Sequence, residues 1–298
     1  MKALAAYVMR GRSQAALLSS LFAVLSMILP PLSYISGAIV ALVTMRRGIG
    51  EGGLIAIIAT LALAIMSHFS TGNMIIAMVF AMMVWLPVWI LAVVLRQTIS
   101  LPLTLAVATM LVMVVMIVFH MAVGDTVLWW REVLDKVFAE ALEQPGMADI
   151  SVMLENTPQF MTALMATAFF ISMVASVCLA RWWQAALYNP GGFQTEFHAI
   201  RLDRPVAIFG TLILVWASIS ATPGSIATDF AIIIGVYASV AGMALVHHWV
   251  ATTQANKGWL ILMYLLLAFI APQILVVLAI FGFADAWLDV RRFYKPAD

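Results

Sequence analysis

Residues 101–123 read LPLTLAVATMLVMVVMIVFHMAV, and this run contains no Asp, Glu, Lys or Arg. The hydrocarbon core of a bilayer is about 30 Å thick and an α-helix rises about 1.5 Å per residue, so about 20 apolar residues cross it. The run is long enough to do so. It predicts a membrane-spanning helix, and the rest of the chain is interpreted outward from it.

The composition of the whole chain agrees with a membrane protein. Hydrophobic residues make up 64% of its 298 residues and charged residues only 10%, whereas soluble domains are about half apolar and a quarter charged. A soluble domain of this size could not bury so much apolar surface. The composition therefore excludes a soluble enzyme, a disordered protein and a nucleic-acid-binding protein, and it makes the lipid bilayer the first expected partner.

Further apolar runs lie on both sides of residues 101–123, separated by charged residues, prolines or short polar stretches. They cover residues 15–29, 32–44, 53–67, 74–95, 160–180, 206–220, 226–246 and 259–287. The pattern predicts an all-α, polytopic transmembrane helical bundle with about eight full spans, or eight to ten segments when proline-broken pieces are counted. We expect residues 1–298 to form a single integral membrane domain.

Prolines interrupt two stretches of this pattern, at Pro30-Pro31 and at Pro272-Gln273. Broken backbone is tolerated at membrane depth only where it is buried in protein or lines a cavity. Both breaks are therefore candidate cavity walls.

The basic residues predict the orientation of the chain. With turns at the two breaks and a cytoplasmic N-terminus, 13 of the 15 Lys and Arg residues face the cytoplasm. Only Arg131 and Lys136 face outward, as expected when positive charge gathers in cytoplasmic loops. We expect both termini to be cytoplasmic, the first apolar run to remain as an anchor, and the protein to lie in the bacterial cytoplasmic (inner) membrane.

Residues 124–159 form the longest polar interruption, with seven acidic residues against two basic ones. Apolar side chains recur in it at helical spacing, and Trp129 and Trp130 are typical of a membrane interface. This pattern predicts an extracytoplasmic amphipathic segment, with a second short helix at residues 150–154. The segment is either a solvated loop with an interfacial helix or a lid over a substrate cavity.

Sequence motifs of common enzymes are absent: there is no phosphate-binding loop, GxSxG, HExxH or CxxC. No apolar run carries a pair of carboxylates that could form a proton relay or ion site. We therefore expect no enzymatic activity, no cofactor and no metal site. Asp229 lies near the end of a run and is interpreted as a boundary residue solvated by water and headgroups.

Polar residues near the outer ends of spans indicate a candidate binding pocket. His120 lies five residues before Asp125, close enough to meet it in a turn, and His68 and Asn73 follow another span. The candidate outer pocket therefore consists of His68, Asn73, His120 and Asp125. Ordinary hydrogen bonding at the membrane interface is the alternative.

Residues 181–205, RWWQAALYNPGGFQTEFHAIRLDRP, form a cytoplasmic loop rich in aromatic and charged residues. Proline fixes φ and glycine tolerates positive φ, so the NPGG sequence predicts a turn. The loop is either structural or a docking surface for a cytoplasmic protein. Its candidate residues are Asn189, Pro190, Gly191, Gly192, Phe193, Glu196 and Arg201.

Small residues repeat at fourfold spacing in the first span, at Ala15, Ser19 and Ala23. Such a ridge allows close approach of helices in a membrane. It serves either packing within the chain or docking to a partner membrane protein.

Two stretches resemble a known family. NPGGFQTEFHAIRL, residues 189–202, and FADAWLDVRR, residues 283–292, resemble the YybS-like family of predicted bacterial membrane proteins. The resemblance covers essentially the whole chain and implies a distant similarity to the S components of energy-coupling-factor vitamin transporters. S components are helical bundles that hold a vitamin near the outer face and dock through small residues of the first helix, here Ala15, Ser19 and Ala23.

Two functions are compatible with these patterns. One is binding or transport of a small, vitamin-like solute by an S-component-like protein. The alternative is a non-transporting scaffold or regulatory protein that recruits a cytoplasmic partner through residues 181–205.

Overall fold

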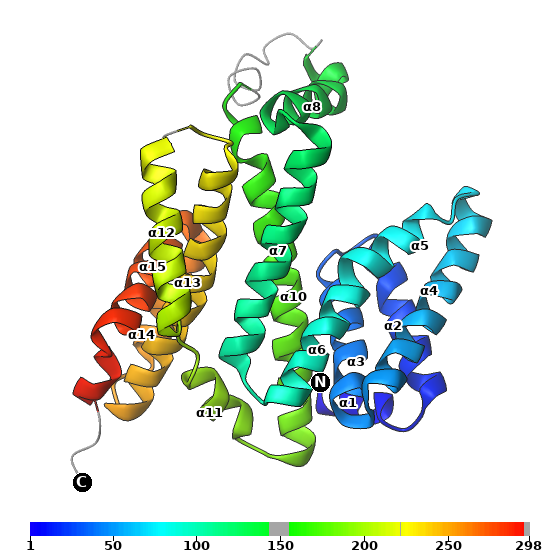
Figure 1. Cartoon of the computed structure of the whole chain (residues 1–298). Helices are drawn as coiled ribbons and strands as arrows, with labels where there is room; N and C mark the ends of the chain where they lie inside the picture. Colours follow the sequence, from blue (N-terminus) through cyan, green and yellow to red (C-terminus); the bar gives the residue numbers. More distant parts are fainter. Residues whose placement is uncertain (143–154, 221, 295–298) are drawn as a thin grey trace. The chain divides into compact units, whose positions relative to one another are not determined.

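The computed structural model describes residues 1–142, 155–220 and 222–294, and every regular element in these ranges is helical (Figure 1). The prediction of an all-helical bundle is confirmed. The chain divides into two units: unit 1 comprises residues 1–108 and 169–200, and unit 2 comprises residues 109–168 and 201–298. The prediction of a single integral membrane domain stays a prediction.

Unit 1 is built around a central helix, α3, which is buried from Ser36 to Met45. Helices α2, α4 and α6 pack against it. The helices of this unit are α1 (Lys2–Val8), α2 (Arg12–Leu25), α3 (Leu32–Arg47), α4 (Ile49–Thr71), α5 (Ile75–Phe80), the π-helical turn η1 (Ala81–Trp85), α6 (Leu86–Thr98) and α11 (Gly192–His198), with the first part of α7 (Leu101–Val123) and the second part of α10 (Pro158–Tyr188).

Unit 2 is built around α13, the long helix with the most extensive burial among the candidate spans. Its N-terminus is capped by Ser225, whose hydroxyl accepts a hydrogen bond from the Thr228 N–H. The unit contains the remainders of α7 and α10, together with α8 (Thr126–Leu142), α12 (Arg204–Ser220), α13 (Ile226–Thr252), α14 (Gly258–Phe269), α15 (Ala271–Leu288) and the 3-10 turn η2 (Val290–Tyr294).

Six helices of the described residues are long and apolar enough to cross a membrane, where the sequence predicts about eight full spans. They are Ile49–Ser70, Ile75–Thr98, Leu101–Val123, Pro158–Tyr188, Ile226–Thr252 and Ala271–Leu288. The apolar helices α2, α12 and α14 have only 14, 17 and 12 residues, so they reach only about 18–26 Å. The difference in number comes from these short helices.

Both predicted proline breaks separate helices. Pro30 and Pro31 lie between α2 and α3, and Pro272 lies in the first turn of α15, directly after the break at Ile270. Proline is tolerated at a helix N-terminus because no intrahelical hydrogen bond is lost there.

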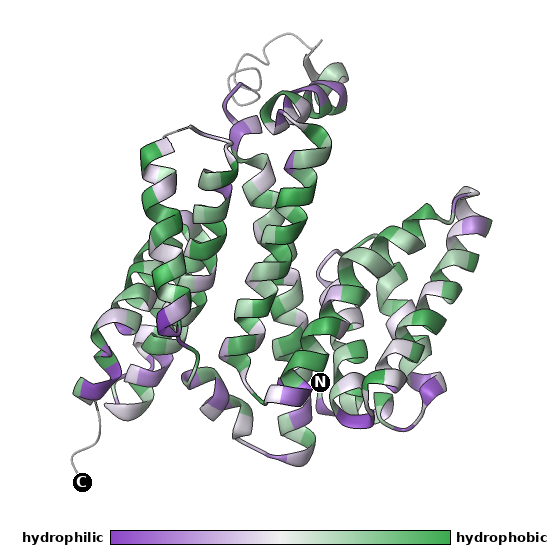
Figure 2. Cartoon of the chain, viewed as in Figure 1, coloured by the Kyte–Doolittle hydropathy of each residue, from purple (hydrophilic) through white to green (hydrophobic). Residues whose placement is uncertain are grey.

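The predicted amphipathic segment contains a helix, α8, in which polar and apolar residues alternate along the ribbon (Figure 2). Trp130 Nε1 donates a hydrogen bond to Thr162 Oγ1 at 3.0 Å, and the Trp129 ring stacks edge-on against Phe119. These contacts hold α8 on α7 and α10. The second predicted helix, at residues 150–154, lies outside the described residues.

Close packing of α13 and α15 depends on two glycines. A Cβ atom at Gly282 would lie 2.1 Å from the backbone oxygen of Ala238, and one at Gly242 would lie 1.8 Å from that of Leu278. No side chain fits at these distances, so the two backbones are in direct contact. Small residues at such crossings are typical of helix packing in membranes.

Gly282→Ala is therefore expected to destabilise the protein by about 1–3 kcal/mol, the usual cost of overpacking. Thermal unfolding of the detergent-solubilised protein measures this effect. Gly235→Ala on α13 is the matched control, because a Cβ there meets nothing within 4 Å. Equal unfolding temperatures for the two variants would contradict the packing argument.

Candidate functional site

The four residues of the predicted outer pocket belong to different units. His68 is exposed in the last turns of α4, and the Asn73 side chain accepts a hydrogen bond from the Ile75 N–H at 2.8 Å. These two residues lie in unit 1, while His120 and Asp125 lie in unit 2. Their grouping into one pocket stays a prediction.

Asp125 acts as a cap for a helix. Its Oδ1 atom accepts a hydrogen bond from the Leu128 N–H at 3.0 Å, at the start of α8. A carboxylate at this position satisfies an otherwise unpaired N–H and interacts well with the helix dipole. The structure thus gives Asp125 a structural role that does not involve His120.

His120 instead faces Asp229. Its Nε2 atom lies 3.4 Å from Asp229 Oδ2, and the Asp229 side chain is completely buried. The interpretation of Asp229 as a solvated boundary residue is therefore wrong. Asp229 lies in the first turn of α13, and its side chain is shielded from solvent.

The ring of His120 is oriented by its own helix. Its Nδ1 atom lies 3.1 Å from the backbone oxygen of Met116, and because a carbonyl oxygen only accepts, Nδ1 carries a proton in this contact. The Nε2 atom is then the atom that faces the carboxylate. This orientation makes His120 and Asp229 a defined pair and not two residues that happen to be close.

The pair is expensive to bury. Among the described residues, no hydrogen-bond partner lies within reach of either Asp229 oxygen or of the Nε2 atom of His120. Ionisable groups within membrane spans are costly and usually mark a functional site. Such a group is normally compensated by a partner of opposite charge or by a proton that the two groups share. The position of Asp229 in the first turn of α13 offsets part of this cost through the helix dipole.

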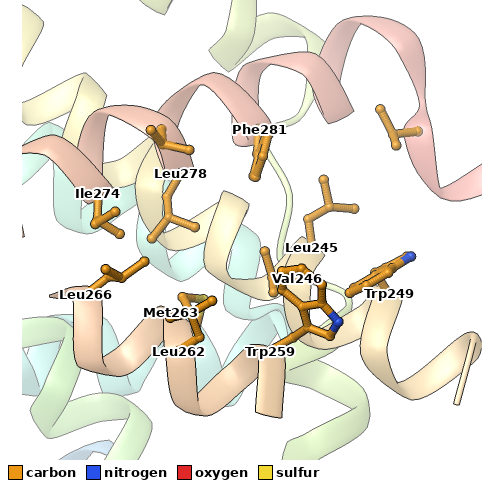
Figure 3. Close-up of a pocket in the computed structure, with 12 residues that line it drawn as sticks. Leu245, Val246, Trp249, Trp259, Leu262, Met263, Leu266, Ile274, Leu278 and Phe281 are labelled. Carbon is orange, nitrogen blue, oxygen red and sulfur yellow. The ribbon is translucent and has the colours of Figure 1, made fainter. Parts of the chain in front are cut away.

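A cavity of about 510 Å³ lies between α13, α14 and α15 (Figure 3). Figure 3 shows side chains from all three helices pointing into it. The lining is apolar apart from two indole N–H groups and consists of Leu245, Val246, Trp249, Trp259, Leu262, Met263, Leu266, Ile274, Val277, Leu278, Phe281 and Val290. The helix that starts at the Pro272 break forms one of its walls.

Polar groups gather next to one end of this cavity. Trp249 and Trp259 stack edge-on with ring centroids 6.1 Å apart. Arg291, next to the lining residue Val290, donates from Nε to Asp285 Oδ2 at 2.7 Å, and both side chains are largely buried. The ion pair lies next to the lining residue Val290 along the chain and is not itself part of the lining.

The predicted turn of residues 189–192 is present. The Gly192 N–H donates to the backbone oxygen of Asn189 at 3.0 Å, and Gly191 has a φ of 88°. Arg181 and Glu196 form a two-pronged ion pair that folds α11 back onto α10, with Nε to Oε2 at 2.7 Å. The exposed Pro190 follows Asn189 in this turn.

The other loop candidates have separate surroundings. Phe193 and Phe197 lie with ring centroids 6.0 Å apart on α11. Arg201 belongs to unit 2, where its Nη1 atom lies 3.8 Å from Asp289 Oδ1. Docking of a partner on these residues stays a prediction.

The small residues of α2 are buried within unit 1. Ala15, Ser19 and Ala23 are at most 1% exposed. The Ser36 hydroxyl donates to the backbone oxygen of Ser19 at 2.7 Å and accepts from Trp85 Nε1 at 3.0 Å. These contacts favour packing within the chain over docking to a partner.

Reasoning from the sequence missed the partner of His120, because the two residues are far apart along the chain. It also missed the cavity, because an apolar lining looks like any other apolar helix face. An acidic residue one turn inside an apolar run was the only available signal for Asp229. In the part of the chain that the structure describes, no three His, Cys, Asp or Glu side chains converge on a metal position.

The family described as "Predicted membrane protein (DUF2232)" matches residues 17–286, and the chain belongs to this family. No curated protein and no solved structure matches the chain. Together with the six long apolar helices, family membership identifies the chain as a multi-pass membrane protein.

A double-mutant cycle tests the pairing of His120. His120→Leu alone leaves a buried carboxylate without its partner, which is expected to cost about 3–5 kcal/mol. His120→Leu combined with Asp229→Leu is expected to cost less than the sum of the single changes by about 1 kcal/mol or more, as for residues in contact. Unfolding temperatures in one detergent measure the coupling.

The matched control is the same cycle with Asp125 in place of Asp229. Asp125→Ala is expected to cost about 1 kcal/mol as a lost cap, and its effect should add to that of His120→Leu within about 0.5 kcal/mol. Coupling to Asp125 with none to Asp229 would restore the pairing predicted from the sequence.

Proposed function

We propose that this member of the DUF2232 family is a non-enzymatic membrane protein that binds a small, mainly apolar solute in the cavity between α13, α14 and α15. The cavity itself is the observation that carries the proposal. Binding there is one step of solute capture or transport. No catalytic chemistry is needed for this step.

The dimensions and the lining support a ligand site. Small-molecule sites are concave, enclose about 300–1,000 Å³ and combine apolar walls with a few polar groups. This cavity has about 510 Å³, two tryptophans and ten other apolar side chains. Glycines bring α13 and α15 into contact, and α14 packs against both helices with its side chains lining the space that remains.

The solute class follows from the same groups. An apolar ring system or chain fits along Leu262, Leu278 and Phe281, and the indole N–H groups of Trp249 and Trp259 are the polar side-chain groups among the lining residues. A mainly apolar, vitamin-like compound with one or two hydrogen-bond acceptors matches this lining. The resemblance to the YybS-like family and to S components supports the proposal in one respect: S components are also helical membrane proteins that bind a small solute.

We further infer that the protein lies in a bacterial cytoplasmic membrane with both termini in the cytoplasm. In this orientation the Trp249 end of α13 is nearer the cytoplasm and Asp229 is nearer the outside. The two residues are separated by 20 residues of one helix, which is about 30 Å. The His120–Asp229 pair then lies close to the opposite surface from the cavity.

The alternative is a scaffold that recruits a cytoplasmic protein through residues 181–205. The Arg181–Glu196 ion pair favours it, because that pair gives α11 a fixed position on α10. A docking function would depend on Glu196 and not on the cavity. Substitutions in the cavity would therefore impair solute binding, and substitution of Glu196 would impair docking.

Val277→Phe should weaken ligand binding, since the larger side chain projects into the cavity that Val277 lines and takes up part of its volume. Thermal-shift screening of the detergent-solubilised protein against vitamins, vitamin precursors and common metabolites measures this. A ligand at 100 times its Kd is expected to stabilise the unmodified protein by about 2.7 kcal/mol.

Val276→Phe is the matched control, because Val276 is the adjacent residue on α15 and does not line the cavity. It should retain the thermal shift. A shift that is undiminished in Val277→Phe would place the ligand elsewhere. Absence of any shift, together with a cytoplasmic partner that is lost on Glu196→Gln, would favour the scaffold.

A further inference from the structure

A second, smaller pocket in unit 1 carries cationic groups that the proposed function does not use. It has a volume of about 250 Å³ and is lined by Met45, Leu95, Arg96, Ile99, Arg181 and Gln184. These residues come from the ends of α3, α6 and α10, and from Ile99 directly after α6. Figure 2 shows that polar residues gather at the same end of these helices.

Backbone oxygens hold the Arg96 side chain in this pocket, and no carboxylate of the described residues neutralises its charge. Its Nη1 atom donates to the backbone oxygens of Met45 and Thr44, at the C-terminal end of α3. A helix C-terminus favours a cation. Among the residues that the structure describes, Arg96 forms no ion pair, and its Nε and Nη2 groups donate to no acceptor.

Arg181 contributes a second guanidinium whose charge is balanced. It donates to Glu196 with Nε and Nη2 and to Gln184 Oε1 with Nη1. Glu196 does not line the pocket, whereas Gln184 does. The pocket thus contains one uncompensated cation, Arg96, and no carboxylate among its lining residues.

The surroundings add to this positive charge. Unit 1 contains seven Lys and Arg residues and only two acidic residues, Glu51 and Glu196. Glu51 is already paired with Arg12, and Glu196 with Arg181. An acidic ligand would therefore meet no negatively charged residue that lacks a basic partner in this unit.

We infer that this pocket binds a phosphate-bearing anion, and that its source is the headgroup of an anionic phospholipid in the surrounding bilayer. Arginine donates to phosphate oxygens in a planar fork, and Arg96 has N–H groups available for this. Basic pockets between membrane helices commonly hold anionic headgroups. Ile99 is 69% exposed beside Arg96 and provides an apolar surface for the acyl chains.

Native mass spectrometry of the full-length protein in detergent tests the inference. Phosphatidylglycerol, phosphatidylcholine and inorganic phosphate are titrated separately. We expect one tight site for phosphatidylglycerol and none for phosphatidylcholine. Arg96→Gln should weaken that site about tenfold or more, because the charge-assisted hydrogen bonds to the headgroup are lost.

Arg10→Gln is the matched control, because Arg10 is in the same unit and stacks over Tyr7 away from the pocket lining. It should leave the affinity unchanged. Equal losses for Arg10→Gln and Arg96→Gln would overturn the site in favour of general surface charge. Binding of inorganic phosphate that depends on Arg96, without binding of phosphatidylglycerol, would overturn the lipid source and identify a soluble phosphate compound.

A second variant separates binding from folding, because Arg96→Gln also removes contacts between α6 and α3. Gln184→Glu keeps every contact of Arg96 and places a carboxylate in the pocket. It should weaken phosphatidylglycerol binding at least as much as Arg96→Gln does. Gln194→Glu is the matched control at an exposed position of α11 outside the pocket, and it should leave phosphatidylglycerol binding unchanged. Full affinity in Gln184→Glu would overturn the inference.

Discussion

The direct backbone contact between α13 and α15 is the constraint on which the rest of unit 2 depends. Gly242 and Gly282 permit it, since a Cβ atom at either position would collide with a backbone oxygen. The third helix of the group, α14, packs beside this close pair, and its side chains point into the space between the three helices. Its leucines and Trp259 do not fill it completely, and the cavity is what remains. A packing rule of membrane helices thus produces a binding-sized space without any polar residue being required for it.

The same helix α13 fixes the buried His120–Asp229 pair near its other end. A carboxylate without hydrogen bonds, away from water, is stable only if an opposite charge or a shared proton compensates for the lost solvation. The Met116 carbonyl oxygen directs one nitrogen of the imidazole, and this leaves the other nitrogen to face Asp229. The pair and the cavity therefore occur on one continuous helix, and movement of α13 against its neighbours would affect both.

The sequence predicted the helices well because lipid leaves the backbone few alternatives, and because charged residues and prolines mark the ends of apolar runs. Residues 101–123 were predicted to the residue as α7. The run 160–180 was predicted too short: α10 continues to Tyr188. Arg181, which looks like a span end, lies within the helix and pairs with Glu196. The partner of His120 could not be predicted in this way. Asp125 was chosen for its nearness in sequence, whereas Asp229 is brought in by tertiary packing that leaves no periodic signal.

The arginines that predict the topology also explain why one end of unit 1 suits an anionic surface. Arg96 and Arg47 are both held by backbone oxygens, Arg96 at the end of α3 and Arg47 by Met9 at the end of α1. Carbonyl oxygens at helix ends carry only partial negative charge. They orient a guanidinium without neutralising it, whereas a carboxylate would do both. Arginines that are anchored by helix ends therefore retain more of their charge than arginines that are paired with carboxylates. In the proposed lipid site, this retained charge is what a phosphate headgroup would meet.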